Sequence, residues 1–410
     1  MKRFTHLLIF ACCLLVGGFS ARGQTSNDVT GQVETIGNPF AAQFPGGDSV
    51  YARNVWDMQV FDGRLYLGYG NSNNDPPAPN AGPVDVWYYD AAGSRFVDEY
   101  TVKDEQIERY VVIDGALYIP GHDPTEDTGK GSIYRLTDAG WQQRQTVPTA
   151  LHVYDLARFE GELYAAISVS SVSHGNTLVV SDDDGETWRQ LRIPIASLDD
   201  QMNVTRAWEL LEVGDKLLVS VQKPVLGVVE NGAEVAAQLD MPLLYQYADG
   251  VFQGLNTDPF PGEASDTRPR VARATPYLDR VVYVGAEVTS DHQWTPFGLF
   301  SIGANLDVSR YPLAAGAMPW DILARDDALY ALLSQPDDAG NTVVSVIGTR
   351  DLANWCPVLQ FNADTFARSF ELYDGDFYFG MGTEADPLSA ASGDILRVKG
   401  QFFTLPAGGC

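Results

Sequence analysis

Histidine is the residue type in this chain that most readily transfers protons near neutral pH. His122, His174 and His292 lie in polar segments that follow apolar, strand-like stretches, and His152 opens such a stretch. The segments around His122 and His152 belong to consecutive units of a repeat, so we expect the two side chains to converge. The alternative is that polar loops, which make up much of the chain, hold these histidines without any shared role.

Arginines occur near the same strand starts as the histidines. Arg109, Arg206 and Arg368 could each bind a carboxylate through a planar guanidinium group. We therefore take His122, His152, Arg206 and Arg109 as candidate catalytic residues. His174 and Arg368 are candidate ligand-binding residues, because mixed histidine and arginine positions suit a carbohydrate or carboxylate ligand.

Aromatic–acid pairs recur near the start of the strand-like stretches. The pairs are Trp56-Asp57, Tyr154-Asp155, Trp208-Glu209, Trp320-Asp321 and, shifted by two positions, Phe370-Glu371, while the second unit has Glu108-Arg109. One interpretation is a ligand site with flat aromatic faces for sugar rings and carboxylates for hydroxyl groups. The other is architecture, in which each acid binds the backbone of a neighbouring unit, since buried acids need partners. No cofactor is predicted, and a structural Ca²⁺ on the carboxylates stays open.

A short phrase that recurs seven times sets the positions of these residues. It consists of an apolar strand, an Asp-Gly turn or a relative of it, and an aliphatic–aromatic pair; its markers are Gly63, Gly115, Gly161, Asp215, Asp279, Asp327 and Gly375. A period near 50 residues with a tight turn between two strands is typical of β-propeller blades. The sequence therefore predicts an all-β fold: a seven-bladed propeller with four antiparallel strands in each blade.

The order of strands in such a blade assigns the candidate residues to one face. The innermost strand of each blade begins at the face where the loop between the second and third strands also lies, and we call this the upper face. All four histidines are expected there. Fourth strands are expected to open with an aromatic residue: Phe96, Trp141, Trp188, Phe252, Trp355 and Phe402. The one helix candidate is residues 231–239, in an insertion of the fourth unit.

The segment Ser181-Asp182-Asp183-Asp184-Gly185-Glu186-Thr187-Trp188 fits the Asp-box pattern Ser-x-Asp-x-Gly-x-x-Trp. It resembles the repeats of sialidases and related secreted propellers. The resemblance implies a turn between the third and fourth strands, so we assign Ser181, Asp183, Gly185 and Trp188 a structural role. Only one clean box is present, and Arg192-Ile193-Pro194 follows it instead of opening the first blade, so a sialidase site is not assigned.

The proposed architecture also resembles certain polysaccharide lyases, such as ulvan lyases, in its residue types and without a matching motif. That resemblance implies that a histidine or tyrosine takes the proton α to a uronate carboxylate while Arg109, Arg206 or Arg368 neutralises the carboxylate. Three functional classes stay open: a lyase or hydrolase acting on polysaccharide, a non-catalytic carbohydrate binder, and a scaffold for a protein partner.

The first residues have the features of a secretory signal, with Lys2 and Arg3 before a short apolar run. We expect a signal peptide over 1–23, an extension over 24–50 that adds a strand or a plug, and the propeller over 51–410. Removing the signal takes three of the 27 basic side chains and none of the 54 acidic ones, for a net charge of −30. A secreted or periplasmic protein of this charge is not expected to bind nucleic acid or insert into a membrane.

Two cysteines remain after the signal, Cys356 and Cys410. In an oxidising compartment we expect them to form a disulfide that fixes the C-terminus. Two isolated cysteines do not give the spacing of a zinc site.

Overall fold

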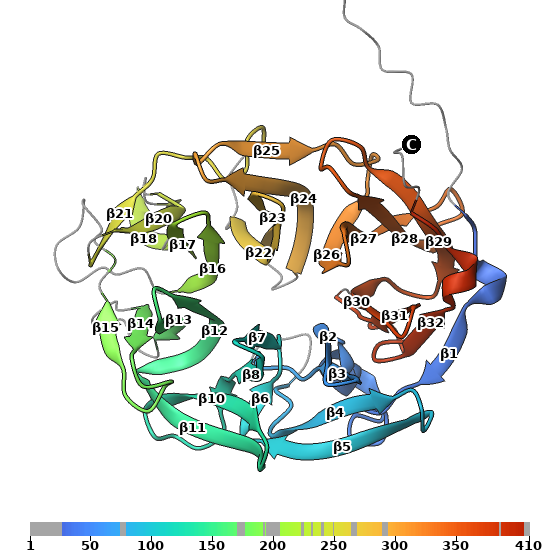
Figure 1. The fold of residues 1–410 in the computed structure, drawn as a ribbon, viewed down its shortest axis with the longest axis horizontal. Helices are drawn as coiled ribbons and strands as arrows, with labels where there is room; N and C mark the ends of the chain where they lie inside the picture. The colour runs from blue at the N-terminus through green and yellow to red at the C-terminus, as the bar shows by residue number, and fades with distance from the viewer. Residues whose placement is uncertain are drawn as a thin grey trace, which may run out of the picture.

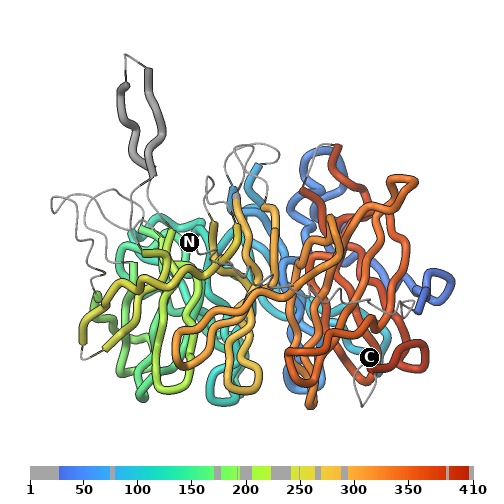
Figure 2. Tube along the Cα trace, turned by 90° about the horizontal axis from the view of Figure 1, so that it is seen from above, coloured from blue at the N-terminus to red at the C-terminus, as the bar shows by residue number. Residues whose placement is uncertain are grey.

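The computed structural model describes residues 27–73, 79–169, 177–191, 193, 206–222, 225–230, 233–238, 242–248, 250–263, 269–288, 294–384 and 387–405. Seven sheets stand around a central axis (Figure 1), as the repeat predicted. Seen from the side, their strands run between the two faces of the ring (Figure 2). Among these residues no helix is long and apolar enough to cross a membrane.

Each blade is built outward from a strand that lines the axis. From the inside outward the strands are β2 (Asp57–Phe61), β3 (Arg64–Gly68), β4 (Val84–Asp90) and β5 (Arg95–Val102) in blade 1; β7 (Val111–Ile113), β8 (Ala116–Pro120), β10 (Lys130–Thr137) and β11 (Gly140–Pro148) in blade 2; β12 (Ala150–Phe159), β13 (Glu162–Val169), β14 (Leu178–Ser181) and β15 (Arg189–Leu191) in blade 3; and β16 (Ala207–Val213), β17 (Lys216–Val221), β20 (Leu244–Ala248) and β21 (Val251–Gly254) in blade 4. Blade 5 has β22 (Pro269–Tyr277), β23 (Arg280–Val288), β24 (Trp294–Gly303) and β25 (Val308–Tyr311); blade 6 has β26 (Met318–Arg325), β27 (Ala328–Pro336), β28 (Thr342–Thr349) and β29 (Cys356–Ala363); blade 7 has β30 (Ala367–Tyr373), β31 (Asp376–Met381) and β32 (Ile395–Val398).

The ring is closed by the N-terminal segment. Strand β1 (Glu34–Gly37) pairs antiparallel with β32 and supplies the fourth strand of blade 7, so the blue and red ends of the chain lie side by side (Figure 1). The propeller therefore includes part of the segment that the sequence analysis set apart as an extension. The expectation that Phe402 opens a fourth strand is wrong, because Phe402 ends the 3-10 helix η3 (Gly400–Phe402).

The turn between the first two strands of each blade explains the repeated phrase. Asp62 and Gly63 both have positive φ values, 47° and 68°, as a two-residue hairpin turn of type I′ requires. Asp114-Gly115 and Asp374-Gly375 have the same signs. The aliphatic–aromatic pair that follows each turn is buried between blades; Leu65 and Tyr66, for example, are both 0% exposed.

Two further short strands link blades 2 and 3 at the upper face. Strand β9 (His122–Pro124) pairs with β12 on one side and with β6 (Asp104–Gln106) on the other. His122 and His152 are direct partners in the β9–β12 ladder. The convergence of these two residues is thus fixed by backbone pairing.

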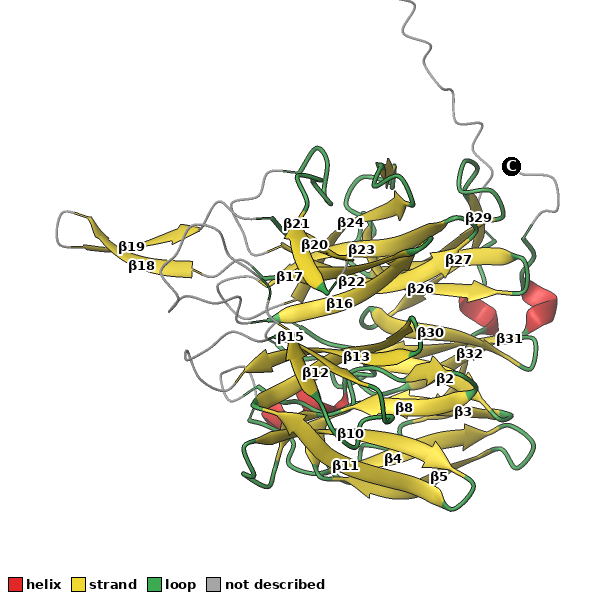
Figure 3. Cartoon of the chain, turned by 60° about the vertical axis from the view of Figure 1, so that its left-hand side comes forward, coloured by secondary structure: helices red, strands yellow, loops and turns green. Residues whose placement is uncertain are grey.

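The insertion in blade 4 contains strands in the place of a helix. β18 (Val225–Glu230) pairs with β19 (Ala233–Gln238) as a separate two-stranded sheet (Figure 3). The helix candidate of residues 231–239 is not a helix at 233–238, where an antiparallel hairpin supplies the backbone hydrogen bonds.

The Asp-box residues form the turn between β14 and β15. The Ser181 hydroxyl accepts from the Gly185 amide at 2.7 Å, and Asp183 accepts from the Thr187 amide at 2.8 Å. Gly185 has φ 90°, and an added Cβ would lie 2.6 Å from Ile133 Cδ1. Trp188 donates from Nε1 to the Thr146 hydroxyl at 3.0 Å. These contacts give the segment a turn-forming role on the outer edge of the blade.

Blade 6 contains a shortened relative of this turn. The Thr349 hydroxyl accepts from the Leu352 amide at 3.0 Å, and Asp351 accepts from the backbone and side-chain amides of Asn354, both at 2.8 Å. The segment lacks the glycine and has one residue fewer before Trp355, so it does not match the Asp-box pattern.

Cys356, at the start of β29, is disulfide-bonded. Its pairing with Cys410 stays a prediction, because Cys410 lies outside the described residues.

Removing β1 should weaken the whole ring, because the edge of β32 would lose its partner. We expect a chain that begins at Asn38 to unfold at a lower temperature than a chain that begins at Gln24, by about 1 °C for each kcal/mol lost. Differential scanning calorimetry measures the shift. A chain that begins at Asn27 keeps β1 and serves as the control; equal transitions in all three chains would contradict closure by β1.

Candidate functional site

Acids of the inner strands connect five of the seven blades to the next blade. Asp57 accepts from the Tyr110 amide at 2.6 Å, and Asp155 accepts from the Leu210 amide at 2.9 Å. The remaining links are Glu209 to the Arg273 amide, Asp321 to the Phe370 amide and Glu371 to the Val60 amide. The architectural interpretation of the aromatic–acid pairs therefore describes what these carboxylates do.

The two blades without an acid at this position supply an arginine. Arg109 of blade 2 lies 3.0 Å from Asp155 Oδ1 and 2.7 Å from Glu209 Oε2 through Nη1. Arg273 of blade 5 lies 3.5 Å from Asp57 Oδ1 and 3.7 Å from Asp321 Oδ1. We call these six residues the neck, because they lie where the inner strands come together around the axis.

The neck has four carboxylates for two guanidinium groups, and burial favours their neutral forms. Burial raises the pKa of Asp155 and of Asp321 to about 7, although Arg109 and Arg273 oppose the shift. Among the described residues no group of three or more His, Cys, Asp or Glu side chains could hold a metal ion. The described structure therefore offers no Ca²⁺ site on this ring of carboxylates.

The aromatic members of the pairs are buried and offer no open face to a sugar ring. Trp56, Trp208 and Trp320 are 8%, 7% and 3% exposed. Trp56 Nε1 donates to the Gly70 carbonyl, and Trp320 Nε1 donates to the Ser334 hydroxyl. The expectation of exposed aromatic platforms is wrong, because the rings pack between blades and against arginines.

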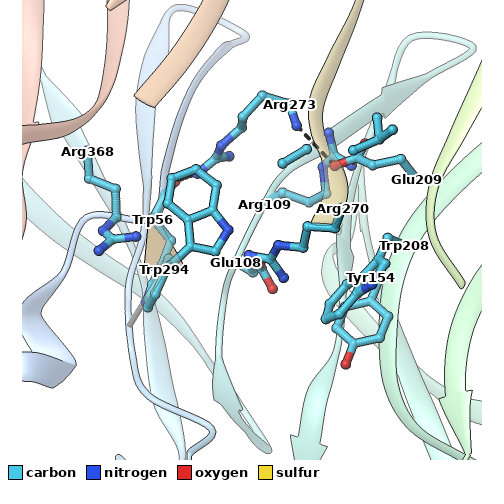
Figure 4. Close-up of a pocket in the computed structure, with 12 residues that line it drawn as sticks. Trp56, Glu108, Arg109, Tyr154, Trp208, Glu209, Arg270, Arg273, Trp294 and Arg368 are labelled. Atoms are coloured by element: carbon cyan, nitrogen blue, oxygen red, sulfur yellow. Dashed lines mark hydrogen bonds and ion pairs between the residues drawn. The ribbon is translucent and has the colours of Figure 1, made fainter. Parts of the chain in front are cut away.

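Above the neck lies a small cavity of about 30 Å³, which we call the upper cavity (Figure 4). Aromatic side chains and ionic groups line it: Trp56, Glu108, Tyr154, Trp208, Arg270, Trp294 and Arg368, with Arg109, Glu209 and Arg273 of the neck. Its volume matches about two water molecules or one small polar group.

Three residues of the upper cavity each keep a buried N–H donor that has no hydrogen-bond acceptor. These donors are Arg270 Nε, Trp208 Nε1 and Trp294 Nε1. The Arg270 guanidinium carbon lies 4.4 Å from the ring centre of Trp208 and 5.5 Å from that of Trp294. Its nearest carboxylate in the described structure is Glu108, at 3.9 Å. A buried donor without a partner is destabilising, so three of them in one place point to a missing acceptor.

Arg368 differs from Arg270 because its charge is satisfied. It forms an ion pair with Glu384, and its Nε donates to the Asn54 side chain at 3.0 Å. Its guanidinium carbon lies 4.1 Å from the ring centre of Trp56. Arg368 therefore serves mainly to hold the aromatic wall of the cavity.

The two histidines stand behind the wall of the upper cavity. Their ring centres are 5.1 Å apart, and the His152 ring stacks on Tyr154 at 5.2 Å. His122 Nε2 lies 3.4 Å from Glu108 Oε2, and His152 Nε2 lies 3.8 Å from Asp123 Oδ2. Asp123, His152, His122 and Glu108 thus form a row of titratable groups that ends at the cavity.

Burial sets the charge of this row. It lowers the pKa of His122, against the opposing effect of Glu108, and it lowers the pKa of His152 to well below the ordinary value. Burial raises the pKa of Asp123 to about 6. Burial also disfavours the Glu108 carboxylate, but His122 and Arg270 outweigh it and the pKa of Glu108 is lowered. Glu108 is therefore ionised and both imidazoles are neutral at neutral pH.

The remaining candidates divide between the cavity and its surroundings. Arg206 is exposed, and its guanidinium carbon lies 5.6 Å from the Trp208 ring centre. Arg109 instead forms an ion pair with Glu209 in the neck. His174, His292 and Arg192 lie outside the described residues. Sequence analysis missed Arg270, Arg273 and Trp294 and gave Glu108 no role; the signal was the break in the aromatic–acid pattern at units two and five.

Comparisons with known proteins assign no family to the chain. No protein-family model and no curated protein matches the chain. A chain of a mitotic checkpoint complex covers 96% of this chain and 98% of its own length at 11% identity, with a TM-score of 0.47. An ancestral GH74 enzyme is 10% identical over 87% of this chain and 48% of its own length, with a TM-score of 0.47. An endo-arabinase from Bacteroides thetaiotaomicron is 13% identical over 62% of this chain and 92% of its own length, with a TM-score of 0.30. These likenesses concern the fold alone.

Arg109 and Arg270 should differ in their effect on stability, although both are arginines beside the channel. Arg109→Met leaves Asp155 and Glu209 without their cation and should cost about 3–5 kcal/mol of unfolding free energy. Arg270→Met removes a poorly paired charge but also a cation beside Glu108, so its loss of unfolding free energy should be well below that of Arg109→Met. Urea denaturation of both variants measures the difference. Equal losses would contradict the assignment of Arg270 to a site that is not needed for folding.

Proposed function

We propose that the protein is a secreted β-propeller that binds an acidic carbohydrate at the upper end of its channel, with the carboxylate of the sugar in the upper cavity. The observation that carries the proposal is the group of three buried N–H donors without an acceptor, on Trp208, Arg270 and Trp294. A carboxylate accepts up to about four hydrogen bonds through its two oxygens, and its charge suits a guanidinium.

The size of the cavity supports a carboxylate more than a whole sugar. About 30 Å³ holds a small group, so the sugar ring would lie above it, towards Tyr154 and Arg206. The strongly acidic surface would repel a polyanion elsewhere on the molecule. We therefore expect recognition of one acidic residue, not tracking along the polymer.

A protein-interaction role has less support from the described surface. The large hydrophobic residues exposed there are Val112, Leu151, Val251 and Leu278, which belong to four different blades. A broad apolar patch of the kind that docks partners needs such residues to be contiguous.

Arg270→Gln should weaken binding of acidic sugars, because it removes the guanidinium charge and its paired N–H donors from the cavity. Isothermal titration calorimetry with glucuronate and galacturonate oligosaccharides measures the affinity, and we expect a loss of at least about tenfold. Arg280→Gln is the matched control: Arg280 is in the same blade but pairs with Asp307. Binding that survives in Arg270→Gln, or that is lost equally in both variants, would contradict the proposal.

The neighbouring residues also fit β-elimination, which makes a lyase the second candidate function. In that reaction a base takes the proton α to the carboxylate, a carbon–carbon double bond forms, and the glycosidic oxygen leaves with a proton from an acid. Tyr154 lines the cavity, and burial raises its pKa to about 12, which suits a proton donor. His122 and His152 are neutral but lie behind the cavity wall against the Tyr154 ring, so they would reach a substrate only through Tyr154. Arg270 would stabilise the charge that develops on the carboxylate.

Turnover of an acidic polysaccharide panel tests the lyase directly. Absorbance of unsaturated uronates would rise with the mature protein and fall by at least about 100-fold in His122→Ala and in His152→Ala if these residues transfer the proton. New reducing ends without unsaturation would indicate a hydrolase. The absence of both signals, together with retained sugar binding, would leave the binding role alone.

A further inference from the structure

Glu108 lies between the cation of the upper cavity and a buried histidine. Its Oε1 is 3.9 Å from Arg270 Nη2, and its Oε2 is 3.4 Å from His122 Nε2. That imidazole nitrogen is buried and has no hydrogen-bond partner. One proton held between Glu108 and His122 would therefore satisfy both atoms.

A carboxylate bound at Arg270 would share this cation with Glu108. Two carboxylates beside one guanidinium in a buried site repel each other, and the repulsion favours the protonated form of either neighbour. His122 is 1% exposed, so solvent screens this repulsion weakly. The ligand and Glu108 cannot both keep a full negative charge there without a cost in affinity.

We propose that binding of a carboxylate in the upper cavity is coupled to uptake of one proton by the Glu108–His122 pair. This inference rests on the proposed function, because it concerns the same ligand, and it adds the regulation of that site by pH. Acidic conditions favour the loaded state, and alkaline conditions favour release.

The other charged groups that face the pair do not compete for the proton. Arg109, Arg206, Arg270, Arg273 and Arg368 supply the positive charges that act on Glu108 or His122. Tyr51 and Tyr154 have raised pKa values because they are buried, so they stay protonated. His152 and Asp123 are the remaining groups of the row. The pKa of His152 is lowered further than that of His122, and Asp123 faces His152 and not Glu108 or His122. The proton therefore goes to Glu108 and His122.

The sign of the pH dependence follows from the ligand charge. A bound anion raises the pKa values of Glu108 and His122, so the complex holds more protons than the free protein over the pH range between the two sets of values. Affinity must then fall as pH rises through that range, by up to about tenfold per pH unit for one coupled proton.

Calorimetry in buffers of different ionisation enthalpy measures the coupling. We would titrate glucuronate into the full mature protein in phosphate and in Tris at several pH values, and we expect uptake of close to one proton per glucuronate. Glu108→Gln should abolish the uptake and flatten the pH dependence while glucuronate still binds through Arg270. Glu371→Gln is the matched control, because Glu371 is also a buried carboxylate beside an arginine but lies in blade 7 and pairs with Arg325.

The outcomes separate this inference from the proposed function. Glucuronate binding that needs Arg270 but takes up no proton overturns the coupling and leaves the proposed function intact. Uptake that persists in Glu108→Gln also overturns it, since the proton then goes elsewhere. Absence of binding by every acidic sugar overturns both.

Discussion

The structure depends on one repeated interaction, a carboxylate of an inner strand that accepts a hydrogen bond from the backbone of the next blade. Inner strands of different blades do not form a common sheet, so their axis-facing amides need acceptors from side chains. Asp57, Asp155, Glu209 and Asp321 supply them, and Glu371 completes the circle from blade 7 to blade 1. The cost is a concentration of buried negative charge on the axis, which Arg109 and Arg273 offset only in part.

The upper cavity differs from the neck in how its polar groups are paired. The neck satisfies its polar groups, whereas the cavity directly above leaves Arg270, Trp208 and Trp294 with unpaired donors and His122 with an unpaired nitrogen. Proteins seldom keep such groups unless a water, ion or ligand completes them or function needs the strain. The same blade whose inner strand lacks the acid, blade 5, supplies both Arg270 for the cavity and Arg273 for the neck.

Closure by β1 and the β9–β12 ladder have different consequences for the site. β1 pairs with β32 on the outer edge of blade 7 and holds the ring together at a distance from the cavity. The β9–β12 ladder acts directly, because it places His122 opposite His152 and so brings a loop of blade 2 against the inner strand of blade 3. The histidine pair is therefore as rigid as the backbone that carries it.

The sequence by itself determined the number of blades and the positions of most of their strands, because turn residues and strand alternation are local properties that recur in every unit. It predicted that His122 and His152 converge, but it left open the alternative that they are unrelated loop residues. It also raised the architectural interpretation of the acids without deciding it. Only the tertiary structure decided that the tryptophans are buried, that Arg109 is committed to Asp155 and Glu209, and that Arg270 is not satisfied. It also showed that β1 fills the last blade and that the insertion is a hairpin. These facts depend on which side chains from distant blades meet at the axis, and spacing along one strand does not contain that information.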